Sequence, residues 1–152
     1  MQTSTQPSTG ATPALTSRGA AIAAQRTEIL GHYDAEQKKA ALKLFDLARM
    51  HLGTSGGNAA ATLLLSLYNG NRFQFDLTRL RGMDVGNLEA AFTVMLMDAT
   101  RCWCEVHELI NAILGVSTTG ALFEVWAYDL RLKGRCTKDG YLHMKKQLAQ
   151  RA

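Results

Sequence analysis

The sequence predicts a mainly α-helical protein, a compact bundle of five to seven short helices with a short extended segment near 72–77. Three observations support this fold class. Apolar residues recur at three- and four-residue steps along most of the chain, glycines separate these stretches, and only one short stretch alternates apolar and polar residues. At 152 residues, the chain fits one domain that buries its apolar stripes helix against helix.

The N-terminal end differs in composition from the rest of the chain. Residues 1–17 are mostly Ser, Thr, Gln, Pro, Gly and Ala, with too few large apolar side chains to offset the entropy of ordering. We therefore expect a disordered tail over 1–17 and a single helical domain over 18–152, whose last helix is basic.

Capping residues and glycines set the expected helix boundaries. Asp34 and Gln37 have the spacing of a capping box, Asn58 can cap an apolar helix, and Asp76 can cap a brief helical turn. Gly134 is expected to end the helix before the basic segment. The expected helices cover 18–30, 34–52, 59–68, 104–114, 120–133 and 141–150, with a further helix that begins at 84 or 87 and ends between 98 and 101, and residues 77–81 form a brief helical turn.

One of these helices has an apolar stripe of large side chains. In the range 84–101, the residues expected to face the core are Leu88, Ala91, Phe92, Met95 and Leu96. Just before it, Phe73, Phe75 and Leu77 alternate with polar residues, which is typical of a strand. No partner strand is evident, so an extended loop anchored by the phenylalanines is the equal alternative.

Composition excludes several classes of protein. No run reaches the roughly 18 apolar residues of a membrane span. The N-terminus does not have a charged region followed by an apolar core, so a secretory signal is not expected. The three cysteines cannot all pair within one chain, which favours reduced thiols and a cytoplasmic location.

Thiol and imidazole groups cluster near residue 104. Cys102, Cys104 and His107 could bind zinc, with Cys136 or His143 as a fourth ligand. The group lacks the two separated pairs of a structural zinc site, so free thiols are favoured and we predict no metal and no cofactor. The neighbouring acids could support acid–base catalysis, but Glu105 and Glu108 have a simpler role at a helix start. No catalytic or nucleotide-binding motif occurs, and we predict no enzymatic activity.

The C-terminal segment carries the positive charge of the chain, whose formal net charge is +4. Its lysines and arginines could neutralise phosphates, and Tyr141 and His143 could stack on bases. The alternative role is to keep a terminal helix in solution. The candidate nucleic-acid-binding residues are Arg131, Lys133, Arg135, Lys138, Lys145, Lys146 and Arg151.

The most distinctive stretch runs from Tyr68 to Arg81 and reads Y-N-G-N-R-F-Q-F-D-L-T-R-L-R, followed later by Met97-Asp98 and by Glu105-Val106-His107. It resembles the signature of a family of uncharacterised bacterial proteins, which look like small accessory proteins of plasmids, integrated elements or prophages. No activity is established for that family, so no catalytic residue is implied. The resemblance suggests that Arg72, Phe73, Phe75 and Asp76 form a shared structural hook.

Together, these features lead us to expect a non-enzymatic accessory protein of a mobile element. It would bind a host protein or protein complex, with host-defence inhibitors such as anti-CRISPR proteins as one example. The candidate partner-binding residues are Arg72, Phe73, Phe75, Asp76 and Trp103. Nucleic-acid binding through the basic segment is the alternative function, and homodimerisation is the alternative use of the aromatic residues.

Overall fold

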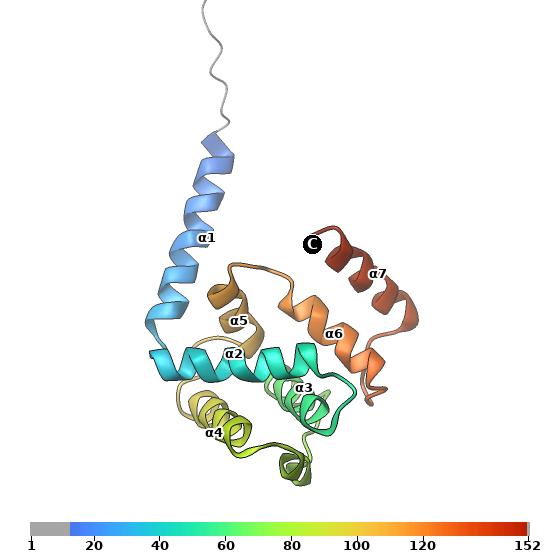
Figure 1. Ribbon diagram of the computed structural model, residues 1–152. Coiled ribbons are helices and arrows are strands. Elements are labelled where there is room, and N and C mark those ends of the chain that lie inside the picture. The colour runs from blue at the N-terminus through green and yellow to red at the C-terminus, as the bar shows by residue number, and fades with distance from the viewer. Residues whose placement is uncertain (1–12, 152) are drawn as a thin grey trace, which may run out of the picture.

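A computed structural model describes residues 13–151 of the chain, with side chains from Ser17 onward, and it is all α-helical (Figure 1). The described residues contain no strand, which confirms the predicted fold class. Residues 13–151 form seven α-helices and one 3-10 helix: α1 Pro13–Gly31, α2 Ala35–Met50, α3 Ser55–Tyr68, η1 Leu77–Gly82, α4 Val85–Thr100, α5 Val106–Leu114, α6 Thr119–Asp129 and α7 Lys138–Ala149.

Helix α1 begins earlier than predicted. Of the expected tail, residues 1–12 lie outside the described residues, whereas Pro13–Ser17 belong to α1. A proline suits the first turn of a helix because it lacks the N–H that would have no partner there. The helix extends away from the bundle (Figure 1), and Arg26 anchors it to α5 by donating from Nε to the Ala112 carbonyl at 2.6 Å.

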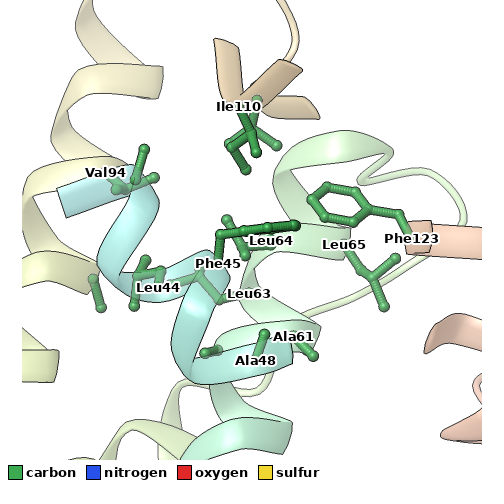
Figure 2. Close-up of a cluster of buried hydrophobic side chains, with 14 of the residues drawn as sticks. Leu44, Phe45, Ala48, Ala61, Leu63, Leu64, Leu65, Val94, Ile110 and Phe123 are labelled. Atoms are coloured by element: carbon green, nitrogen blue, oxygen red, sulfur yellow. The ribbon is translucent and has the colours of Figure 1, made fainter. Parts of the chain in front are cut away.

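Helix α3 lies at the centre of the core, as its apolar composition indicates. It packs against α2 and also contacts α4, α5 and α6. Large side chains from all five helices meet there, so the core is a single cluster. Figure 2 labels ten of its members: Leu44, Phe45, Ala48, Ala61, Leu63, Leu64, Leu65, Val94, Ile110 and Phe123.

Two helix starts illustrate how caps position these elements. The Asp34–Gln37 capping box is present as predicted at the start of α2. By contrast, Thr54 rather than Asn58 caps α3, because Gly57 can sit in its first turn. A Cβ on Gly57 would lie 1.9 Å from the His51 carbonyl oxygen, so only glycine permits this close approach between α2 and α3.

The segment after α3 begins with a turn and does not form a strand. Phe73 is buried and Phe75 half-buried, in agreement with the alternative of an anchored loop. Asp76 then caps η1 as predicted, accepting the Thr78 N–H at 2.8 Å.

The predicted core stripe of α4 is wrong in part. The buried residues are Ala90, Ala91, Val94 and Met97, whereas Phe92 and Leu96 face outward. Alanines let α4 approach α2 closely, and this close packing outweighs the burial of the larger side chains.

The C-terminal helices also differ from their expected boundaries. Helix α6 ends at Asp129 instead of near Gly134, and α7 begins at Lys138 instead of Tyr141. Residues 138–140 form the first turn of α7, because Thr137 caps the helix by accepting the Gly140 N–H at 3.2 Å. None of the helices in the described residues is long and apolar enough to span a membrane.

Candidate functional site

A buried ion pair joins the distinctive motif to helix α6. Arg72 donates from Nη1 to Oε1 of Glu124 at 2.5 Å and from Nη2 to Oε2 at 2.8 Å. Tyr68 donates its hydroxyl to the same Oε1 at 3.2 Å. The Glu124 side chain is only 10% exposed and that of Arg72 is 33% exposed. We call Tyr68, Arg72 and Glu124 the Arg72 clamp; it links the end of α3 to α6.

The local sequence explains how Arg72 reaches α6. Asn69 ends α3, and its backbone carbonyl accepts the N–H groups of Arg72 and Phe73 at 3.1 and 2.9 Å. The Asn69 side chain also accepts the Arg72 N–H. This tight turn points the guanidinium back toward the bundle, where its Nε donates to the Gly134 carbonyl at 3.1 Å. Phe73, 2% exposed, secures the turn in the core.

The charges of the clamp stabilise each other. Hydrogen bonds from Arg72 lower the pKa of Glu124 despite its burial, so this carboxylate is ionised at neutral pH. Burial, with Glu124 nearby, raises the pKa of Tyr68. Glu124 accepts three hydrogen bonds from Arg72 and Tyr68, so most of the about four acceptor sites of its carboxylate are engaged within the protein. The arrangement therefore suits a structural link better than proton transfer.

His107 lies beside the clamp with an unpartnered nitrogen. Its ring meets the edge of Tyr68 at a centroid distance of 4.9 Å, and its Nδ1 is buried without a hydrogen-bond partner. Neither Glu105 nor Glu108 accepts a hydrogen bond from this nitrogen. Burial lowers the pKa of His107, while Glu108 and Glu105 oppose the shift. Those two glutamates instead occupy the start of α5, where Glu108 Oε2 accepts the Glu105 N–H at 3.1 Å.

The five residues predicted to bind a partner do not form one surface. Phe73 is buried, Arg72 and Phe75 are half-buried, and the Asp76 carboxylate caps η1. Asp76 and Trp103 are exposed. Trp103 is 63% exposed, and its ring stacks on His32 at a centroid distance of 3.7 Å. The hook expected from the resemblance is thus a structural feature directed inward.

The cysteines lie outside the helices. Cys102 and Cys104 occupy the loop between α4 and α5, and Cys136 lies between α6 and α7. All three are free thiols whose pKa values are raised, chiefly by burial. His143 is exposed and its Nε2 pairs with Gln147 at 3.1 Å. Within residues 13–151, no three His, Cys, Asp or Glu side chains come together in a way that could hold a metal ion.

The seven predicted nucleic-acid-binding residues lie in one part of the fold. Three are in the loop between α6 and α7, three are on α7, and Arg151 follows α7. Each is exposed, and none is paired with a carboxylate in the part of the chain that the structure describes. Arg151 instead donates to the Ser117 hydroxyl at 2.6 Å, which ties the C-terminal end of α7 to the loop before α6.

Sequence reasoning missed an apolar surface on α4. Val85, Phe92 and Leu96 are 72%, 55% and 65% exposed, and together with Glu89 they form what we call the α4 outer face. These positions repeat at three and four residues and therefore share one side of the helix. The sequence contained the signal, because α4 is apolar on two sides, and the side with the larger residues was assigned to the core.

Comparison with known proteins finds one family match. None of the curated proteins and none of the solved structures compared with the chain matches it. A family model matches residues 38–127, which is more than half of the chain and contains the Arg72 clamp, His107 and the α4 outer face, while α1 and α7 lie beyond it. The chain therefore belongs to DUF7673, a family of unknown function.

Proposed function

We propose that this protein acts by binding another protein through the α4 outer face, without catalysing a reaction. The observation behind the proposal is the alignment of three large apolar side chains, each more than half exposed, along one side of one helix. Contiguous exposed apolar surface is typical of interaction sites, because leaving it in water is unfavourable. The engaged carboxylate of the Arg72 clamp also supports a non-enzymatic role.

The charge of α4 indicates the chemistry of the partner. The helix contains Glu89 and Asp98 but no lysine or arginine, and Asp84 caps its N-terminus. Glu89 lies within the outer face, between Val85 and Phe92. A complementary partner would insert apolar side chains beside Phe92 and Leu96 and place lysine or arginine around them, since charge complementarity guides association and suppresses wrong partners.

The proposal extends to the biological setting of the protein. The motif resemblance supports an accessory protein of a bacterial mobile element, working in the cytoplasm against a host protein such as a component of a defence system. The free cysteines support the location. If a defence component is the target, expressing the protein should let a restricted phage or plasmid become established in a defended host. Continued restriction would argue against this setting.

A charge-reversal variant tests the binding surface. The double variant Phe92→Glu/Leu96→Glu adds two negative charges to the α4 outer face, and Ile22→Glu/Leu142→Glu makes the same change at two exposed apolar positions on α1 and α7. A partner isolated from the natural host would be identified, purified and titrated with each variant. We expect the α4 variant to bind at least ~10-fold more weakly, as for loss of apolar anchors, and the control to bind normally.

Several outcomes would contradict the proposal. Equal binding by both variants would exclude the α4 outer face. Turnover of a defined substrate, lost on substitution of His107 or Glu105, would show an enzyme instead. Sedimentation of the purified protein distinguishes a third case, in which Phe92→Glu/Leu96→Glu dissociates a homodimer and the partner is a second copy of the chain.

A further inference from the structure

The basic region around α7 is a second surface, on the side of the molecule away from α4 (Figure 1). We call it the α7 basic surface. Its seven cations are exposed, and Asp139 is the only acidic residue between Arg131 and Ala152. Because these cations make no ion pair within the described residues, their charge is available to an external ligand. The surface comprises Arg131, Lys133, Arg135, Lys138, Lys145, Lys146 and Arg151.

Arg131 occupies a backbone position that normally favours glycine. It ends α6 with φ of +55°, and it is the one non-glycine residue with positive φ among those described. The Arg131 N–H bonds to the Tyr128 carbonyl and the Leu132 N–H to the Ala127 carbonyl, both at 3.0 Å, which is the Schellman pattern of a helix end. An arginine at this strained position is unfavourable for folding. We therefore infer that its charged side chain serves in binding.

Aromatic rings organise two further cations. Tyr128 of α6 stacks on Tyr141 of α7 with a centroid distance of 4.2 Å. The Arg135 guanidinium lies 5.6 Å from the centre of the first ring, and the Lys145 ammonium lies 5.7 Å from the second. Cation–π contacts of this kind hold a charged group over a ring. Because the Tyr141 ring is occupied inside the protein, it does not serve as the free base-stacking platform that the sequence suggested.

We propose that the α7 basic surface binds the sugar–phosphate backbone of nucleic acid, with little dependence on base sequence. This inference concerns a different surface from the proposed protein-binding function and goes beyond it. Lysines and arginines neutralise phosphates, which carry no sequence information, and Tyr141, one of the two rings that the sequence suggested for base stacking, is engaged with Tyr128.

Two other anionic partners fit the surface less well. A helix that lies on a membrane needs a free apolar side. In α7, Met144 and Leu148 are half-buried on the side of Tyr141, and the helix packs against α6. An acidic protein would need apolar or aromatic anchors at the centre of the contact, and Leu142 is the sole large exposed apolar side chain on α7.

Salt-dependent binding to two labelled probes, a single strand and a duplex of the same sequence, tests the proposal. Fluorescence anisotropy at several potassium chloride concentrations would give the slope of log K against log salt. With about six phosphates neutralised, we expect a slope near −5 for the duplex. The variant Lys138→Gln/Lys145→Gln/Lys146→Gln should lose about three of those contacts and flatten the slope accordingly.

A matched variant controls for net charge. Lys39, Lys43 and Arg49 are exposed on α2, so Lys39→Gln/Lys43→Gln/Arg49→Gln removes the same charge elsewhere. This control should retain the wild-type slope. No binding at low salt, an equal loss in both triple variants, or displacement of the probe by polyglutamate as readily as by unlabelled nucleic acid would each overturn the proposal.

Arg131→Gly separates binding from folding. Glycine accepts the positive φ, so the melting temperature should stay the same or rise by about 3 °C, while the slope flattens by about one contact. We therefore expect the variant to be at least as stable as the wild type but to bind nucleic acid more weakly. Unchanged binding would show that the strained arginine does not serve the surface, and the proposal in this form would fail.

Discussion

Helices α3 and α7 have opposite relations to the rest of the molecule. α3 buries eight residues and its C-terminal motif directs Tyr68 and Arg72 onto Glu124, whereas α7 buries none and its lysines remain unpaired within the described residues. The family match covers α3 and ends before α7. The most distinctive motif of this chain therefore stabilises the fold, whereas the charged groups that can bind ligands lie at the periphery, on α7.

Removing the Glu124 carboxylate should produce the largest effect. Glu124→Ala leaves the Arg72 guanidinium partly buried without its partner, and breaking such a pair costs about 4 kcal/mol. Urea denaturation followed by circular dichroism would measure the loss. Lys145→Ala on α7 is the matched control, and we expect it to change the free energy of unfolding by less than about 0.5 kcal/mol. Similar losses in the two variants would remove the contrast between the helices.

Two phenylalanines differ in the same way in how deeply they are buried. Phe73 is 2% exposed and Phe92 is 55% exposed. Phe73→Ala should lower the free energy of unfolding by about 3 kcal/mol, because it leaves a cavity beside the core. Phe92→Ala should change it by less than about 1 kcal/mol and should weaken partner binding instead. A reversed order of the two losses would mean that the outer side of α4 is the buried one.

Acid should lower the stability of the protein through two groups, His107 and Glu124. Burial lowers the pKa of His107 from its ordinary value of 6.5, and hydrogen bonds from Arg72 lower the pKa of Glu124 from 4.5. In both cases the unfolded chain takes up the proton first, so stability is full above these values and is lost as pH falls through the folded pKa. Urea midpoints should decline below about pH 6.5 and again below about pH 4.5. In His107→Gln, the first decline should disappear; its persistence would assign the decline to another group.

The smallest expected effect is an increase in the free energy of unfolding. Arg131→Gly relieves a left-handed backbone conformation at the end of α6 and should stabilise the protein by about 1 kcal/mol. Thermal unfolding would measure it, with Lys133→Gly in the same loop as a control that has no positive φ to relieve. A loss of stability in Arg131→Gly would show that the arginine side chain supports the fold.

Patterns that depend on neighbouring residues were readable in the sequence. The Asp34 capping box, the central apolar helix α3 and the cap at Asp76 followed from local spacing. The orientation of α4 did not, because small alanines pack closely only when a suitable partner helix faces them, and sequence does not reveal that partner.

The clamp shows the same limit at the candidate site. Arg72 was singled out by its motif, yet nothing local connects it to Glu124, which lies 52 residues further along the chain. Glu124 lies among apolar residues in the middle of α6, and this position was the available clue, since an acid buried among them requires a partner. The left-handed conformation of Arg131 was not predicted, because glycine is the usual residue after the end of a helix and Gly134 lies nearby.

A double-mutant cycle on Arg72 and Glu124 tests most directly whether the distinctive motif is architectural. Unfolding free energies would be measured for the wild type, Arg72→Met, Glu124→Leu and the double variant. Because the two groups form a bidentate, largely buried pair, we predict a coupling energy of about 2–3 kcal/mol, with the double variant more stable than the sum of the single losses implies. Additive losses, with a coupling below about 0.5 kcal/mol, would contradict the account.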